Sequence, residues 1–338
     1  MIRDAIATVV EGNSLTFEEA REVMDEMMTG QATFSQVGAF LTAIRVKGET
    51  VDEIAGMASV MREKALRVML PCTAIDIVGT GGDGTGSLNI STAASFVAAG
   101  AGLRVAKHGN RAASSQCGSA DVLETLGAKI ELSPESVQRC IEEAGIGFMF
   151  APMYHPSMKY VASTRKEIGI RTIFNYLGPL CNPANVPHLL LGVPSEQIGE
   201  KIAAVLHRLG TTHSMVVYGT DGFDELSISA PSLLWEVSKG FVKSPCQVTP
   251  DEFSCHIYPK EAVRGGNAKY NAKAIRLLLD GERGPFREVV IMNAAAALMI
   301  AGKTNDMKTA SAIATESIDS GRAKQTLEKY IELTNRLS

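Results

Sequence analysis

The sequence predicts an α/β protein in which a small all-helical domain precedes a larger domain with a central, mostly parallel sheet flanked by helices. Three observations predict this fold: only helical patterns before residue 70, short apolar runs alternating with helical stretches from residue 74, and a glycine-rich turn after the first run. With 338 residues, 45% of them hydrophobic, the chain can bury a sizeable core. We place the helical domain at residues 1–70 and the α/β domain at 71–338.

The helical domain is marked by three helix starts in which a threonine is followed three positions later by glutamate or glutamine. The pairs are Thr16 with Glu19, Thr33 with Gln36, and Thr50 with Glu53. In such a pair each side chain bonds to the backbone N–H of the other residue, which caps a helix. Apolar residues recur at helical spacing between these starts, so each helix is expected to bury one face.

In the larger domain, strands are expected at 74–79, 103–109, 146–152, 188–193 and 214–219, separated by helical stretches. Such βαβ alternation predicts parallel pairing. Residues 153–183 interrupt the pattern, and a crossover within about 160–185 is expected to complete the helical domain. Ligands of open α/β sheets bind beyond the carboxyl ends of the strands, so the loops after residues 78, 106, 151 and 218 should share one crevice.

The first strand runs into the turn GTGGDGTG at 79–86, and a helix begins near Asn89. Glycines let backbone N–H groups approach an anion, and the helix N-terminus adds a partial positive charge. The turn therefore predicts a phosphate cradle, with tight strand–helix packing as the alternative. The polar side chains from Asn89 to Thr92 could cap the helix or bind phosphate and metal-bound water.

A dinucleotide site is a minor alternative, because the same turn also satisfies the G-x-G-x-x-G pattern. That fold would place an acidic residue at the end of the next strand to hold a ribose hydroxyl. Here the strand ends in Lys107 and His108. The following residues, through Ser119, combine cations, hydroxyls, glycines and an amide, which favours a polyanion-binding loop over a merely solvated one.

Adjacent carboxylates, Asp224 and Glu225, follow the strand at 214–219. Mg²⁺ is commonly held by one or two carboxylates together with substrate phosphates, so the pair is a candidate metal site. An ordinary acidic surface loop is the alternative.

Composition disfavours several other classes of protein. A net charge of −4 gives no basic field for nucleic acid, and the cysteines and histidines lack zinc-ligand spacing. No apolar run reaches the length of a membrane span, and the first residues lack the apolar core of a signal peptide. We expect a cytoplasmic protein with reduced thiols and neither a membrane nor a nucleic-acid partner.

The segments GTGGDG, NIST, KHGNRAASSQCGSADVLETLG, GIRTIFNYLGPLCNP and DELS resemble the anthranilate phosphoribosyltransferase family, over nearly the whole chain. The resemblance implies a helical domain beside a nucleoside-phosphorylase-like α/β domain, and a homodimer. It also implies transfer of the phosphoribosyl group of 5-phosphoribosyl 1-pyrophosphate (PRPP) to the amine of anthranilate. The products would be N-(5-phosphoribosyl)anthranilate and pyrophosphate, in tryptophan biosynthesis.

By motif position, the resemblance assigns one large set of residues to PRPP: Gly79, Gly82, Asp83, Ser87, Asn89, Ile90, Ser91, Thr92, Lys107, His108, Gly109, Asn110, Arg111, Ala112, Ala113, Ser114, Ser115 and Ser119. It assigns Gly79, Asn110 and Arg165 to anthranilate. It assigns Ser91, Asp224 and Glu225 to Mg²⁺, with two ions expected per subunit. Further expected neighbours of anthranilate are His108, Tyr154, His155 and Arg171. For Arg165, pairing with Glu167 or a helix C-terminus is the structural alternative.

The chain departs from the usual family residues at Ser87, Leu88, Cys181 and Ser163-Thr164. Ser87 keeps the hydroxyl of the threonine it replaces. Because a neutral arylamine is already nucleophilic, no obligatory general base is expected. Two rivals remain: a pyrimidine nucleoside phosphorylase, whose phosphate loop also ends in Asp-x-Leu-Glu like residues 121–124, and a catalytically silent, nucleic-acid-binding relative.

Overall fold

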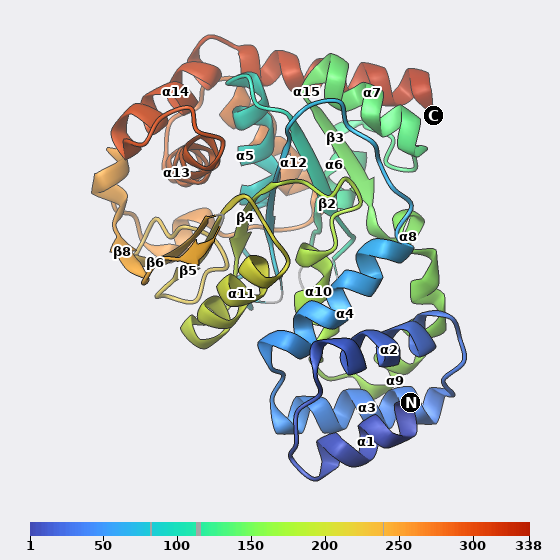
Figure 1. The fold of residues 1–338 in the computed structure, drawn as a ribbon. Coiled ribbons are helices and arrows are strands. Elements are labelled where there is room, and N and C mark those ends of the chain that lie inside the picture. Colours follow the sequence, from blue (N-terminus) through green and yellow to red (C-terminus); the bar gives the residue numbers. More distant parts are fainter. Residues whose placement is uncertain (82, 113–115, 239) are drawn as a thin grey trace.

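The computed structural model describes residues 1–81, 83–112, 116–238 and 240–338 (Figure 1). Four helices open the chain: α1 (Ile2–Val10), α2 (Phe17–Met28), α3 (Phe34–Lys47) and α4 (Val51–Lys64). The three predicted capping boxes are confirmed, because each threonine and its partner exchange both hydrogen bonds at the starts of α2, α3 and α4. Local sequence therefore determines where these helices begin.

The central sheet has the order β3-β2-β1-β4-β5-β6-β7, with β8 paired to β6. Its strands are β1 (Ile75–Gly79), β2 (Val105–Gly109), β3 (Ile146–Phe150), β4 (His188–Gly192), β5 (His213–Gly219), β6 (Ser232–Ser238), β7 (Phe241–Val242) and β8 (Cys246–Val248). The five expected strands are all present and pair in parallel. Strands β6 to β8 are antiparallel additions that the sequence did not lead us to expect.

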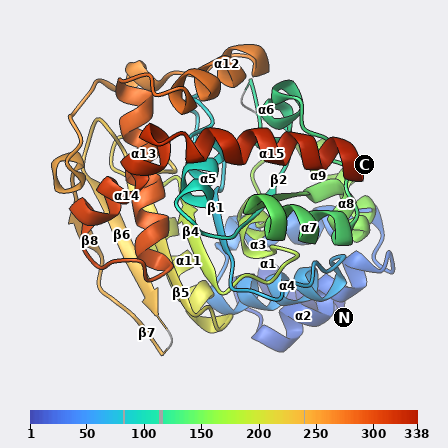
Figure 2. The same cartoon turned by 90° about the horizontal axis from the view of Figure 1, so that it is seen from above.

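Helices cover both faces of the sheet (Figures 1 and 2). The remaining helices are α5 (Ile90–Gly100), α6 (Ser119–Leu126), α7 (Pro134–Ala144), α8 (Ala151–Tyr154), α9 (Ala162–Ile168), α10 (Phe174–Leu180), α11 (Glu196–Arg208), α12 (Ala268–Leu279), α13 (Pro285–Ile300), α14 (Met307–Asp319) and α15 (Arg322–Leu337), with 3₁₀ turns at Pro156–Tyr160, Pro250–Phe253 and Lys260–Val263. In the part of the chain that is described, no helix is both long and apolar enough to cross a membrane.

Alternate residues of the central strands enter two different cores, as the pleat of a strand requires. On β4, Leu190 joins the core formed with α5 and α13, whereas Leu189 and Leu191 join the core formed with α11 and the N-terminal helices. The second core also includes Leu177 and other apolar residues of the crossover. The N-terminal helices and the sheet are thus joined by continuous apolar packing.

Candidate functional site

The loops after β1, β2, β3 and β5 all leave the sheet at its carboxyl edge, and the loops after β1 and β5 are in direct contact there. The loop after β5 crosses the ends of β1 and β4 so closely that a Cβ on Gly79 would lie 2.4 Å from Asp224 Oδ2. A Cβ on Gly192 would lie 1.5 Å from the Asp224 carbonyl oxygen. Only glycine fits at these two strand ends, so the backbone itself places Asp224 beside the glycine turn.

Three acidic side chains gather at this point. Asp224 Oδ2 accepts a hydrogen bond from the Gly81 N–H at 2.7 Å, and burial together with the charge of Asp83 raises its pKa to about 7. Burial and the charge of Asp224 raise the pKa of Glu225 to about 8. Asp83 itself accepts from the Thr85 N–H at 3.1 Å. Ionisation of this cluster is unfavourable unless a cation neutralises it.

Lys107 lies next to the acidic cluster and is buried. Its ammonium donates to the Ile77 carbonyl at 2.6 Å and to Ser91 Oγ at 3.3 Å. Burial lowers the pKa of Lys107, while the nearby charges of Asp76 and Glu225 act in the opposite direction. A backbone hydrogen bond from Ser91 to Glu225 partly offsets the rise in the pKa of that carboxyl. Ser91, Lys107 and Glu225 are therefore neighbours, as three of the sequence assignments require.

The start of α5 is not capped by a side chain of the described residues. The amide of Asn89 is engaged elsewhere: Oδ1 accepts from Asn271 Nδ2 at 2.8 Å, and Nδ2 donates to the Cys117 carbonyl at 3.2 Å. Ile90 is buried in the core, and Thr92 Oγ1 is buried without a hydrogen-bond partner among the described residues. Helix capping thus does not account for the polar residues at 89–92.

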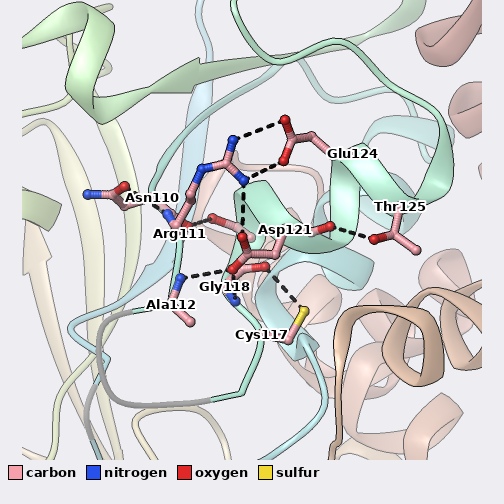
Figure 3. A network of polar contacts seen from close by, with 9 residues as sticks. Asn110, Arg111, Ala112, Cys117, Gly118, Asp121, Glu124 and Thr125 are labelled. Carbon is pink, nitrogen blue, oxygen red and sulfur yellow. Dashed lines mark hydrogen bonds and ion pairs between the residues drawn. The ribbon is translucent and has the colours of Figure 1, made fainter.

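Two acidic side chains of α6, Asp121 and Glu124, bind the loop after β2 (Figure 3). Asp121 Oδ2 accepts from the N–H groups of Ala112 and Gly118 at 2.9 and 2.8 Å. Arg111 forms ion pairs with Asp121 and Glu124, which raise the pKa of its guanidinium. Arg111 therefore points to α6. The Asn110 carbonyl accepts from Ser119 Oγ at 3.3 Å.

Four of the assigned residues, Gly82, Ala113, Ser114 and Ser115, lie outside the described part of the chain. Ser87, Gly109 and Asn110 are on the turn and loop that border the crevice. Ser87 also forms an antiparallel bridge with Arg264, which sequence reasoning did not single out.

The crossover supplies two arginines to this side of the molecule. The Arg165 guanidinium lies 4.8 Å above the ring of Phe174, and burial lowers its pKa. Among the described residues Arg165 forms no ion pair, so pairing with Glu167 is not observed, but Arg165 does lie in the last turn of α9, as the other form of the structural alternative expects. Arg171 Nη2 donates to the Gly81 carbonyl at 3.1 Å, which joins the crossover to the glycine turn.

Two buried histidines, His108 and His155, lie beside the loops with their ring centroids 5.0 Å apart and the rings tilted by 57°. Burial lowers the pKa of His108 to about 3 and that of His155 to about 4, so both rings are neutral near pH 7. Their Nε2 atoms have no partner within the described ranges. The structure does not place Tyr154 with them: its hydroxyl donates to the Leu132 carbonyl at 2.9 Å, inside the α/β core.

Sequence reasoning missed a buried polar link beneath the site. Asn182 Nδ2 donates to Asp76 Oδ2 and to the Ala106 carbonyl, both at 2.8 Å. Burial raises the pKa of Asp76 to about 6, although Lys107 acts against this rise. The amide thereby joins the crossover to β1 and β2. A buried, chain-distant contact of this kind leaves no periodic signal in the sequence.

The chain matches two family descriptions in order along its length. Residues 3–65 match "Glycosyl transferase family, helical bundle domain", and residues 72–324 match "Glycosyl transferase family, a/b domain".

Curated relatives and solved structures extend this likeness over whole chains. The anthranilate phosphoribosyltransferase of Dehalococcoides mccartyi is 53% identical over 100% of this chain and 99% of its own length. The crystal structure of the Thermus thermophilus enzyme of that name superposes with a TM-score of 0.93, at 44% identity, covering 98% of this chain and 99% of its own.

The Saccharomyces cerevisiae enzyme in complex with PRPP and Mg superposes with a TM-score of 0.92, at 27% identity, covering 99% and 98% of the two chains. The same yeast enzyme has also been solved with 4-fluoroanthranilate. Identity above one half over the full length of a curated relative, with one fold and one domain order, shows that the chain belongs to the anthranilate phosphoribosyltransferase family.

Proposed function

We propose that this protein transfers the phosphoribosyl group of PRPP to the amine of anthranilate, giving N-(5-phosphoribosyl)anthranilate and pyrophosphate in tryptophan biosynthesis. The observation that carries the proposal is the full-length likeness to enzymes of that name, one of which binds PRPP and Mg. The carboxyl edge of the sheet fits this reaction, because a glycine turn, a helix N-terminus and the buried carboxyls of Asp224 and Glu225 meet there.

The pyrophosphate of PRPP would lie on the turn and on the start of α5, where backbone N–H groups and the helix dipole favour an anion. We propose the residues assigned from the sequence as its contacts, with two refinements. Because the Asn89 side chain is bonded to Asn271 and Cys117, Asn89 would reach the ligand through its backbone or after rearrangement. For Arg111, binding phosphate would require exchange of its ion pairs with Asp121 and Glu124.

Mg²⁺ suits the acidic cluster, since it prefers carboxylate oxygens and substrate phosphates. Asp224, Glu225 and Ser91 would hold it, and we propose two ions per subunit. Among the described residues no group of three or more His, Cys, Asp or Glu side chains is arranged to hold a metal ion, so substrate phosphate oxygens and water would complete the coordination. The raised pKa values of both carboxyls support this fit, because a dication would favour their ionised forms. Bound Mg²⁺ would neutralise the charge of the leaving pyrophosphate.

Anthranilate would lie beside Arg165, Asn110 and Gly79. Arg165 is half-buried, stacked on Phe174 and without an ion pair among the described residues, so its guanidinium can donate to the carboxylate of anthranilate. The neutral rings of His108 and His155 offer polar atoms without adding charge. We propose that these side chains orient the amine, and that no residue acts as an obligatory general base.

We also propose that the protein is a cytoplasmic homodimer formed through its helical domain, comprising residues 1–70 and the crossover within about 160–185. Contacts of α9 with α3 support this domain assignment. Val10, Phe34, Val46 and Ile170 are exposed on these elements. Light scattering coupled to gel filtration would test the dimer; a monomer at micromolar concentration would contradict it.

The reaction is tested by following the fluorescence of anthranilate on mixing with the protein, PRPP and Mg²⁺, omitting each in turn. We expect fluorescence to fall only in the complete mixture. Turnover of thymidine and phosphate instead would favour a pyrimidine nucleoside phosphorylase. Salt-sensitive DNA binding without consumption of anthranilate would favour the silent relative.

A further inference from the structure

Residues 263–266, the segment directly before α12, run alongside the end of the glycine turn. The Leu88 N–H donates to the Val263 carbonyl at 2.9 Å, and the Gly265 N–H donates to the Gly86 carbonyl at 2.8 Å. A Cβ on Gly265 would lie 2.5 Å from the Ser87 carbonyl oxygen, so the two backbones are in direct contact. The segment therefore braces the turn immediately before α5 begins.

Asn271, in the first turns of α12, connects this brace to both candidate phosphate loops. Its side chain is 1% exposed. Oδ1 accepts from the Gly266 N–H at 2.8 Å, and Nδ2 donates to Asn89 Oδ1 at 2.8 Å. A side-chain hydrogen bond with Cys117 partly offsets the burial that raises the pKa of that thiol.

Asn89 continues the connection to the second loop. Its Nδ2 donates to the Cys117 carbonyl at 3.2 Å, directly before Gly118 and the start of α6. Two side-chain amides thus join three backbone segments that are distant in the sequence: 265–266, the residue before α5, and 117. A buried amide with its partners satisfied holds such a junction in one arrangement, and losing one partner leaves a buried polar group unpaired.

We propose that Asn271 is a positioning residue for PRPP: through Asn89 it fixes the start of α5 relative to the loop after β2. This inference rests on the proposed function, since it assumes that the two loops bind the same phosphorylated substrate. Asn271 is buried behind Asn89 and acts on the ligand through it. Its removal lowers affinity for PRPP and leaves the side of the crevice near Arg165 unchanged.

The test compares Asn271→Ala with Asn267→Ala, a matched control on the same helix. Asn267 caps α12 by accepting from the Tyr270 N–H at 3.0 Å and has no part in the junction. Its loss should destabilise α12 without moving Asn89. For Asn271→Ala we expect the Kd for PRPP, measured with Mg²⁺, to rise about tenfold, which corresponds to about 1.4 kcal/mol. The KM for anthranilate should change less than twofold, and Asn267→Ala should leave both values near wild type.

A double-mutant cycle tests whether Asn271 acts through Asn89. If it does, Asn271→Ala adds little to the PRPP defect of Asn89→Ala, whereas independent effects multiply. Asn271→Asp, which keeps the acceptor for Gly266 but loses the donor to Asn89, provides a second route if the alanine variant does not fold; we expect a similar defect. An unchanged Kd in a folded Asn271 variant, or multiplying effects, would overturn the inference. Failure of the wild-type protein to consume anthranilate would instead refute the proposed function.

Discussion

Replacing the buried acid pair with amides, as Asp224→Asn together with Glu225→Gln, should abolish activity and at the same time stabilise the protein at pH 8. In the folded state burial and the charges of neighbouring carboxylates, Asp83 for Asp224 and Asp224 for Glu225, raise the two pKa values to about 7 and about 8, from ordinary values of 3.8 and 4.5. The folded state therefore binds more protons than the unfolded state between about pH 4 and pH 8. The contribution of this pair to stability consequently falls as pH rises through this window, and changes little below it.

The size of the effect follows from the shift. Three pKa units correspond to about 4 kcal/mol for one carboxyl, at 1.36 kcal/mol per unit. Relaxation of the loop and sharing of a proton reduce the gain, so we expect the amide variant to be about 2–4 kcal/mol more stable at pH 8. Asparagine Oδ1 can still accept from the Gly81 N–H, so the variant keeps that contact.

Urea unfolding at pH 5 and pH 8, without Mg²⁺, measures this difference. The wild-type free energy of unfolding should fall between the two values of pH, whereas that of the amide variant should change much less. Mg²⁺ should raise the unfolding midpoint of the wild type alone. A variant that is no more stable than wild type at pH 8, or one that retains magnesium-dependent turnover, would refute the reasoning.

Two further substitutions test the geometry of the crevice. Gly79→Ala should place a methyl group 2.4 Å from Asp224 Oδ2. Urea unfolding should show a loss of about 1–3 kcal/mol of stability, and steady-state kinetics should show a sharp fall in kcat/KM. Unchanged kinetics would contradict the close approach of Gly79 and Asp224. Arg165→Gln should raise the KM for anthranilate about tenfold or more, because a charged hydrogen-bond partner of the carboxylate is lost, and should leave the Kd for PRPP within twofold. Equal changes for both substrates would argue against placing anthranilate at Arg165.

Much of the fold follows from local patterns in the sequence. Capping boxes mark the starts of α2, α3 and α4, and continuous apolar runs mark the buried parallel strands. Strand β6 was missed although its burial partly alternates, with Trp235 buried and its neighbour Glu236 more exposed. The pairing of β7 and β8 with β6 depends on tertiary contacts that so few residues cannot signal.

In the candidate site, too, some residues could be found from local sequence motifs, whereas others depend on tertiary contacts. Motif position brought Gly79, Asp224 and Lys107 to one crevice, because parallel strands end at one edge. The residues that support these groups were not found: Asn182 contacts Asp76 across 106 positions, and Asn271 contacts Asn89 across 182. Contacts at such separation have no local periodicity, and an asparagine has no preference that distinguishes a buried junction from a turn.

The central claim is phosphoribosyl transfer from PRPP to anthranilate. Its most direct test measures, in one reaction, the anthranilate consumed, the pyrophosphate released and the mass of the product formed. We predict equal amounts of the first two, a product whose mass is that of N-(5-phosphoribosyl)anthranilate, and no reaction when Mg²⁺ is chelated. Pyrophosphate release without consumption of anthranilate, or anthranilate left unchanged in the complete mixture, would contradict the account.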